Sequence, residues 1–346
     1  MSLRVGIVGA GVLGRLLASR LARNGQQVEV FDAAPHADAP LATGWVAAGM
    51  LSPLAELECG NHEVYTLGMR SLALWSRWLP ALAQTVPFAA EGSLLLAFPQ
   101  DRGSAERILQ QLKHKAPDWQ TPPTLSKTEL HALEPALAPQ LMGWPLSTEG
   151  YLHPTLAMQA LWADAQQHGA RAHWGCTVHA TKPGQVQLEH ETRPFDWVFD
   201  TRGLGARTDL PLRGVRGEIF TLHAPGVVLT RPLRLLHPRY RVYLVPRAGE
   251  HIMVGASELE SEDRSPPSLR STVELLSAAH SVIPALAEAR VIAAHSHLRP
   301  ALPDNLPVLQ QQAGLTHING LFRHGWLLAP ALVEQAITHL AQEHAA

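Results

Sequence analysis

The chain has 346 residues, of which 46% are hydrophobic and 17% charged, a composition typical of globular proteins with room for two domains. Its 28 Lys and Arg residues balance 30 Asp and Glu residues without forming a basic stripe, so we expect no nucleic-acid partner. No apolar run approaches the roughly twenty residues that span a bilayer, and the first predicted strand follows Met1 too closely for a signal peptide, so we expect a cytoplasmic protein without a membrane partner.

Residues 3–32 have the pattern of a strand, a glycine-rich turn, a helix and a second strand, which is the unit that binds a dinucleotide. Gly9 permits the tight turn, Gly11 lets the backbone approach a pyrophosphate, and Gly14 lets the helix pack closely on the strand. The helix begins near Gly11 and directs its unpaired N–H groups at the phosphates. The cofactor-binding residues predicted in this turn are Gly9, Gly11, Val12, Leu13 and Gly14.

The second strand of this unit ends at Asp32, about twenty residues after the glycines. A carboxylate at this point accepts hydrogen bonds from ribose hydroxyls and repels a 2'-phosphate, so NADP is disfavoured. The unit alone leaves both NAD and FAD open.

Residues 43–53, TGWVAAGMLSP, are rich in small side chains and have neither helical nor strand periodicity. Such a segment suits a backbone that lies close to a flat ligand, and it also suits the first turn of an alanine-rich helix. The patterns that follow predict helices at 64–83 and 102–113, a buried strand at 92–98 and a short helix opened by the capping box Ser126–Glu129.

Strands and helices alternate again after Tyr151, which indicates a return to the nucleotide-binding sheet. The predicted elements are a helix to Gln167, strands at 170–174 and 196–200, a glycine-containing turn at 201–206, a strand-rich stretch at 212–290 with one helix at 271–281, a strand at 291–298, a constrained loop at 299–307 and a final helix opened by 322–330. We therefore expect a nucleotide-binding domain from residues 1–50, 151–210 and 291–346, and a substrate-binding domain from residues 51–150 and 211–290.

The cysteines and histidines do not predict a metal site. Cys59 and Cys176 lie far apart and lack metal or redox spacing, so a disulfide framework and a zinc site are not expected. Among 19 histidines, only His295 and His297 share one face of a predicted strand. Because no third ligand accompanies them, we interpret this pair as packed or surface residues.

Six motifs in a fixed order resemble the D-amino-acid oxidase family of flavoproteins, and within it most closely the glycine oxidases of thiamine biosynthesis. The motifs are GAGVLG, WVAAGMLSP, RGLGAR with RGVRGE, YLVPR with VGAS, RPALPDNLP and FRHGWLLAP. The resemblance extends from Val5 to about Pro330. It implies an α/β fold, with a glutathione-reductase-like, Rossmann-type FAD-binding domain beside an α+β substrate domain that has a mixed sheet. It also implies FAD as a non-covalent cofactor.

The same resemblance implies roles for individual residues. Arg299 matches the arginine that binds the substrate carboxylate, Tyr243 matches the tyrosine whose hydroxyl assists it, and Arg323 matches an arginine near the pocket and the flavin. From the residues alone, Arg299 could instead be a structural ion-pair partner, Tyr243 a half-buried strand residue and Arg323 a neighbour of a helix cap. The further flavin contacts implied are Ala47, Ala48, Gly49, Met50, Gly203, Arg323, Gly325, Leu327 and Leu328.

The resemblance implies oxidative deamination of glycine or another small amino acid by hydride transfer to the flavin. The product is an imine, which gives glyoxylate and ammonia in water and feeds thiazole synthesis in the thiamine pathway. Reoxidation by oxygen gives hydrogen peroxide, and the family likeness suggests a dimer or tetramer. Because the amine must lose its proton first and no side chain is a convincing base, we expect activity to rise toward alkaline pH.

Two other functions stay open at this stage. One is a D-amino-acid or sarcosine dehydrogenase that passes electrons to a quinone or a protein, and the other is an FAD-binding subunit without catalysis. Three positions bear on the site: Gln310 stands where the family often has glycine, Leu321 stands where histidine commonly precedes the Phe-Arg pair, and Arg241 shares a strand face with Tyr243 and could add positive charge at the pocket mouth.

Overall fold

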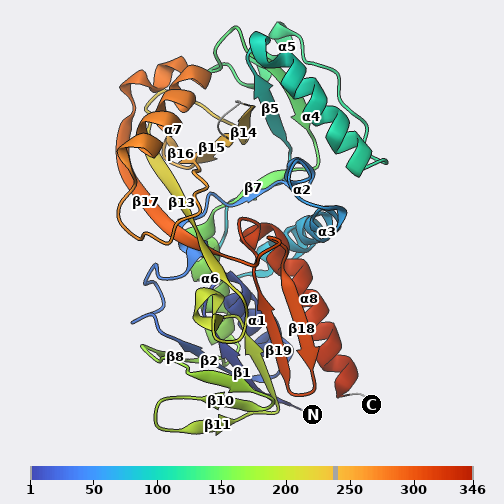
Figure 1. Cartoon of the computed structure of the whole chain (residues 1–346), viewed down its shortest axis with the longest axis vertical. Coiled ribbons are helices and arrows are strands. Elements are labelled where there is room, and N and C mark those ends of the chain that lie inside the picture. The colour runs from blue at the N-terminus through green and yellow to red at the C-terminus, as the bar shows by residue number, and fades with distance from the viewer. Residues whose placement is uncertain (1, 237–240, 345–346) are drawn as a thin grey trace.

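The structure, a computed structural model, describes residues 2–236 and 241–344 of the chain. Two large sheets lie at opposite ends of an elongated molecule, with the chain passing between them several times (Figure 1). The fold is α/β with mixed sheets, as the sequence predicts.

The first sheet contains six strands in the order β18-β19-β12-β1-β2-β8. Its five strands from β19 to β8 run parallel, and only the edge strand β18 is antiparallel to its neighbour. Central parallel strands are buried on both faces, which explains the apolar run at the start of the chain. In sheet order the strands are Val308–Gln312, Leu315–Asn319, Trp197–Asp200, Arg4–Val8, Gln27–Asp32 and Arg171–Trp174.

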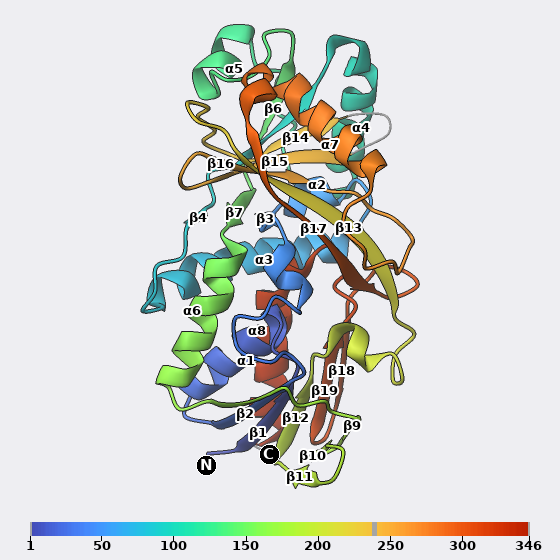
Figure 2. The ribbon, with the colours of Figure 1, turned by 90° about the vertical axis from the view of Figure 1, so that its left-hand side faces the viewer.

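Helices cover one face of this sheet, and a small antiparallel sheet covers the other (Figure 2). The helices pack on one another through an apolar core that includes Leu16, Leu161 and Trp75. They are α1 at Val12–Arg23, α3 at His62–Trp78, α6 at Pro154–Gln167 and α8 at Gly325–Glu343. The small sheet consists of β9 at Ala180–Lys182, β10 at Gln185–Gln187 and β11 at Thr192–Pro194.

The second large sheet has seven strands in the order β17-β13-β16-β15-β14-β5-β6. Only the β14–β5 pair is parallel, so this sheet is mixed. In sheet order the strands are Arg290–Ala301, Arg213–His223, His251–Gly255, Arg241–Arg247, Leu233–Leu236, Ser93–Ala97 and Met142–Leu146. The helices at this end are α4 at Arg102–Lys115, α5 at Lys127–Leu133 and α7 at Leu269–Val282.

The long strands β13 and β17 run from the second sheet toward the first (Figure 1). Short elements fill the space between the two sheets, and they place the small-residue segment 43–53 beside the glycine turn. They are the 3-10 turn Thr43–Val46, β3 at Met50–Leu51, α2 at Pro53–Glu56, β4 at Phe88–Ala89 and β7 at Gly150–Leu152, with β7 between β3 and β4 in a three-stranded sheet.

Several sequence predictions match these elements, and one strand is longer than predicted. The capping box at Ser126 is present, with Glu129 donating its backbone N–H to the serine and accepting from its N–H in return. The strand predicted at 291–298 continues through Ala301, because each added residue pairs with β13. β17 therefore belongs to the second sheet, and the predicted domain boundaries stay predictions.

Candidate active site and cofactor cavity

The glycine turn between β1 and α1 has the geometry that its sequence predicts. Gly9 has φ +96°, a conformation that side chains disfavour, and its N–H donates to the carbonyl of Phe31. A Cβ atom at Gly14 would lie 1.8 Å from the carbonyl oxygen of Gly9, so only glycine fits there. A Cβ atom at Gly11 would meet only the side chain of Ala42, at 3.6 Å, which leaves this backbone open to the cavity.

Asp32 lies at the end of β2 beside this turn. Its carboxylate accepts hydrogen bonds from the backbone N–H of Ala10 and, at 2.7 Å, from that of Ala34. The carboxylate also lines the cavity described below. Asp32 therefore fixes the turn in addition to offering an acceptor to a ligand.

A buried arginine, which sequence reasoning did not single out, holds the same turn from behind. Arg15 on α1 donates to the carbonyl of Ala10 at 2.8 Å, to that of Met158 at 2.9 Å and to that of Ala37. Its guanidinium also lies 5.0 Å from the ring centre of Trp45. Burial lowers the pKa of Arg15 to about 10, so the side chain is a cation at neutral pH. It forms no ion pair with any residue in the described part of the chain.

One cavity of about 1290 Å³ runs from the glycine turn to the second sheet. The predicted cofactor and substrate residues come together along it, except that Gly14 and Leu328 lie behind its wall. The predicted residues that line the cavity are Gly9, Gly11, Val12, Leu13, Asp32, Ala47, Ala48, Gly49, Met50, Gly203, Tyr243, Arg299, Arg323, Gly325 and Leu327.

The small-residue segment forms a wall of this cavity. A single 3-10 turn covers Thr43–Val46, and the chain is extended at Ala47, so the alanines do not open a helix. Gly49 has φ +70°, and a Cβ atom there would lie 2.3 Å from the carbonyl oxygen of Leu152. Small residues here let the backbone itself face the cavity.

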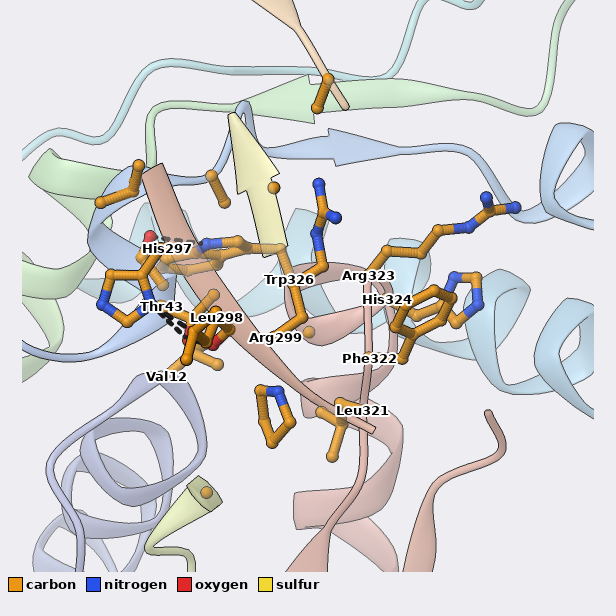
Figure 3. A pocket seen from close by; sticks show the side chains of 18 of the residues that line it. Val12, Thr43, His297, Leu298, Arg299, Leu321, Phe322, Arg323, His324 and Trp326 are labelled. Atoms are coloured by element: carbon orange, nitrogen blue, oxygen red, sulfur yellow. Dashed lines mark hydrogen bonds between the residues drawn. The ribbon is translucent and has the colours of Figure 1, made fainter. Parts of the chain in front are cut away.

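Arg299 on β17 lies at the substrate-sheet end of the cavity (Figure 3). Its Nη1 donates to the carbonyl of Ser257 at 3.1 Å and to that of Arg216 at 3.4 Å. A Cβ atom at Gly217 would lie 2.3 Å from the Cζ atom of Arg299, so this glycine makes room for the guanidinium. Burial lowers the pKa of Arg299, and the nearby charge of Arg323 acts in the same direction. No carboxylate of the described residues pairs with Arg299, and its Nε and Nη2 atoms have no hydrogen bond to them.

Tyr243 on β15 lies near Arg299, and its side chain also depends on a neighbouring glycine. Gly255 pairs with Tyr243 across the sheet, and a Cβ atom there would lie 2.8 Å from the tyrosine hydroxyl. Burial raises the pKa of Tyr243 above its ordinary value. The hydroxyl therefore stays protonated, and able to donate, through the alkaline range.

Arg323 faces the same cavity in a different environment. Its Nη2 lies 2.6 Å from Glu56 Oε2 and its Nη1 lies 3.0 Å from Glu258 Oε2. Although burial opposes ionisation of Glu56, the charges of Arg323 and Arg234 hold the pKa of this carboxyl well below its ordinary range. Two carboxylates thus neutralise Arg323, which makes it a structural ion-pair partner at the edge of the site.

His324 is the next residue along the chain and is fully enclosed. Burial lowers its pKa to about 4, so the ring is neutral at physiological pH. Its Nδ1 lies 3.4 Å from Glu56 Oε2 and has no hydrogen-bond partner among the described residues. Glu56, Glu258 and His324 were not found from the sequence, because nothing in PLAELE or ASELE indicates which carboxylate turns inward.

The structure describes the side chains of Gln310 and Leu321, two of the three further positions considered in the sequence. Gln310 lies within the regular edge strand β18, opposite His317, so no tight turn occurs there. Leu321 is buried and lines the cavity, which puts an apolar side chain at that point. The side chain of Arg241 lies outside the described residues.

Neither a metal site nor a membrane span is found in the described part of the chain. No group of three or more His, Cys, Asp or Glu side chains there is arranged to hold a metal ion. Within residues 2–236 and 241–344, no helix is both long and apolar enough to cross a bilayer. Cys59 and Cys176 are both free thiols.

A comparison with known families decides the assignment. The family described as FAD dependent oxidoreductase, DAO, matches residues 4–336 of this chain. The chain belongs to this family. As an FAD-dependent oxidoreductase it uses FAD, and the residues present fit this cofactor: the open backbone at Gly11, the N-terminus of α1 and Asp32 lie at one end of a cavity long enough to continue past Ala47–Met50 to Arg299.

Individual relatives cover nearly the whole chain. A Rhizobium etli protein with the name thiamine biosynthesis oxidoreductase ThiO is 36% identical over 343 residues, which are 99% of this chain and 97% of that protein. The bifunctional protein ThiO/ThiG of Trichormus variabilis is 29% identical over 94% of this chain, which spans only 50% of that longer relative. The crystal structure of glycine oxidase from Geobacillus kaustophilus matches with a TM-score of 0.84 and 24% identity, covering 97% of this chain and 94% of that one, and therefore supports the fold.

Proposed function

We propose that the protein catalyses the FAD-dependent oxidative deamination of glycine or another small amino acid. The observation that supports this most directly is the contrast between two arginines in one cavity. Arg323 is neutralised by Glu56 and Glu258, whereas Arg299 has only carbonyl partners among the described residues. Of these two, Arg299 is therefore the guanidinium left to bind an anion that enters the site.

A substrate carboxylate is the anion that suits Arg299 best. The planar guanidinium offers two parallel N–H donors, a geometry that matches a carboxylate and that lysine cannot provide. Nε and Nη2 are the two donors still without a described partner, and they lie on one edge of the group. The Tyr243 hydroxyl, kept protonated by burial, can donate a third hydrogen bond.

The charges around the site favour an amino acid with a single carboxylate and a neutral amine. Glu56 and Glu258 are engaged by Arg323, and the neutral ring of His324 adds no positive charge. One uncompensated cation at Arg299 balances one carboxylate. A protonated amine would instead add a charge that no free described carboxylate in the Arg299 environment offsets.

The amine proton is lost to water in this proposal. Glu56 and Glu258 are held in ion pairs with Arg323. Burial lowers the pKa of His324 to about 4, so none of these three side chains is suited to act as a base. The amine lone pair then forms the C=N bond as the α-carbon loses its hydrogen with two electrons. FAD, held by the glycine turn and Asp32, would supply the acceptor for that hydride. With oxygen and two protons as final acceptors the second product is hydrogen peroxide, and hydrolysis of the glycine imine gives glyoxylate and ammonia.

The names of the relatives support a place in thiamine biosynthesis. The similarity to the Rhizobium etli ThiO protein extends over almost the full length of both chains, and the bifunctional ThiO/ThiG relatives carry the same unit within a longer protein. We infer that the imine made by this protein feeds thiazole formation.

Steady-state turnover with purified holoprotein tests this proposal. Glycine, sarcosine and D-alanine would be supplied separately in air, with hydrogen peroxide and the keto acid product both quantified. We expect peroxide and keto acid in equal amounts, with the highest kcat/KM for one of these small amino acids. Keto acid formed only when a quinone or another artificial acceptor is added would instead identify a dehydrogenase.

A further inference from the structure

The two histidines of the His295-Ser-His297 sequence have different environments in β17. The His295 side chain is exposed and makes no hydrogen bond to a described residue. The His297 side chain lines the cofactor cavity, and burial lowers its pKa. A structural role for His297 would explain the difference.

His297 is bonded to a segment far away in the sequence. Its Nε2 lies 2.8 Å from the carbonyl oxygen of Leu41, and because a carbonyl only accepts, this nitrogen carries the proton. Its Nδ1 lies 3.1 Å from the Thr43 hydroxyl oxygen. The Thr43 hydroxyl donates to the carbonyl of Leu298 at 2.9 Å, so the two side chains connect segment 41–46 to β17 (Figure 3).

The segment that His297 holds, residues 41–46, is a wall of the cofactor cavity. A Cβ atom added at Gly44 would lie 3.7 Å from Val12, and Ala42 lies against Gly11, so the segment borders the glycine turn. The segment also packs on α6, Trp45 lies against Arg15, and Trp326 Nε1 donates to the carbonyl of Gly44 at 3.1 Å. His297 is the side chain that connects the segment to β17 through Leu41.

The strand on the other side of the connection carries the substrate arginine. His297 and Arg299 are two residues apart on β17, so their side chains leave the strand on the same side, and both line the cavity. The imidazole therefore lies between the cofactor wall and the residue that we expect to bind the carboxylate.

We propose that His297 is a positioning residue that fastens segment 41–46 to β17, so that the FAD cavity is ordered before FAD binds and Arg299 is held relative to it. The part that concerns Arg299 rests on the proposed function, whereas the part that concerns FAD does not. A wall that is already ordered loses less conformational freedom on binding, which strengthens affinity without a new contact to the ligand.

Titration of the apoprotein with FAD, followed by the quenching of flavin fluorescence and without any amino acid, tests this proposal. We expect His297→Ala to raise the Kd for FAD about tenfold, the effect of losing the hydrogen bond to Leu41 and the contact with Thr43. His297→Gln, whose amide can still donate toward Leu41, should recover part of the affinity. Thr43→Val, which keeps the shape but removes the hydroxyl, should raise the Kd by about threefold.

His295→Ala is the matched control, because it removes the other histidine of the same strand face. Its Kd for FAD should stay within about twofold of the wild type. At saturating FAD, His297→Ala should raise the KM for glycine while leaving kcat nearly unchanged, a split that simple loss of stability does not produce.

The proposal is wrong if His297→Ala and Thr43→Val both bind FAD as tightly as the wild type. It is also wrong if His295→Ala weakens FAD binding as much as His297→Ala, because the effect would then belong to the strand in general. If the protein binds FAD as expected but turns over no amino acid, the proposed function fails and the FAD titration still decides the role of His297.

Discussion

Arg299 and Arg323 lie in one cavity but have opposite surroundings, and this contrast sets what the site can bind. Removing one partner of a buried ion pair such as Arg323–Glu56 strongly destabilises the folded protein, because the other charge stays buried. Arg299 has no such partner among the described residues. Substitutions at the two arginines should therefore have different consequences.

Replacing Arg299 with alanine should raise the KM for the amino acid about a hundredfold or more. The loss of one member of a desolvated charge pair costs about 3–5 kcal/mol, and each 1.4 kcal/mol is about a factor of ten. FAD content should be unchanged, since Arg299 lies at the substrate-sheet end of the cavity. Steady-state kinetics together with the flavin-to-protein ratio measure both effects.

Arg102→Ala is a suitable control for this substitution, because Arg102 lies on the surface in an ion pair with Glu106. Its KM should equal that of the wild type. An Arg299→Ala enzyme with an unchanged KM would contradict the assignment of the carboxylate site.

Gly217 should also be needed for substrate binding, because it makes room for the guanidinium of Arg299. The added methyl group of Gly217→Ala would lie 2.3 Å from Arg299 Cζ, so the guanidinium must move. We expect the KM to rise about tenfold or more, because a shift of about 1 Å is enough to spoil a bidentate contact. Gly103→Ala, where nothing lies within 4 Å of the added atom, should have no effect on KM.

At the scale of elements, α1 is fixed by Arg15 as much as by its glycines. Arg15 bonds the carbonyls of Ala10, Ala37 and Met158, which belong to the turn, to the chain after β2 and to α6. Arg15→Met leaves three carbonyls without their donor, and each buried unsatisfied group costs about 1–3 kcal/mol. We expect the free energy of unfolding to fall by about 3 kcal/mol and FAD binding to weaken.

Urea unfolding of the apoprotein and titration with FAD measure these two effects. Arg20→Met changes the same helix one and a half turns later, where the guanidinium packs on Trp78 away from the cavity. This control should lose some stability and keep its affinity for FAD. If Arg15→Met and the wild type bind FAD with equal affinity, Arg15 does not help to form the FAD-binding cavity.

The elements that could be predicted from the sequence are those whose pattern is local. The turn at Gly9–Gly14, the helices and the capping box at Ser126 follow from spacing and backbone preference. The extension of β17 through Ala301 could not be predicted, because it depends on pairing with a strand far away in the chain. The short strands β9 to β11 carry no clear alternation, and their packing on β1 and β12 explains why they form.

The candidate site was predictable to a similar degree. The family motifs predicted that Arg299, Tyr243 and Arg323 lie near one pocket, and in the structure all three line one cavity. The acids that neutralise Arg323 were missed, since the partner of a charge is set by folding and not by spacing. His297 was interpreted as a packed or surface residue rather than a metal ligand, and its contacts with Leu41 and Thr43 could not be predicted because they join residues distant in the sequence.

At the scale of the whole molecule, buried ionisable groups make stability dependent on pH. His324 has a pKa of about 4 in the folded protein against an ordinary 6.5. Between these values the unfolded chain binds a proton that the folded protein does not, so the free energy of unfolding falls as the pH falls. Below the ordinary pKa of a carboxyl, Glu56 and Asp200 add to the loss, because their pKa values are held down in the folded state.

The apoprotein should therefore lose stability from about pH 6.5 downward, and more steeply below about pH 4.5. In the upper part of this range His324 contributes up to about 1.4 kcal/mol per pH unit. His324→Gln, which is neutral at every pH, should have a flatter profile there. Urea unfolding at several pH values checks this, and identical slopes for the two proteins would contradict it.

In the proposed function, bound FAD takes electrons from a small amino acid that is held by Arg299. The most direct measurement is anaerobic mixing of the holoprotein with glycine, sarcosine and D-alanine in turn, followed by the loss of flavin absorbance. We expect rapid bleaching with at least one of these amino acids, at a rate that rises with pH as the amine loses its proton. Bleaching by none of them, with FAD bound and the protein folded, would contradict the claim.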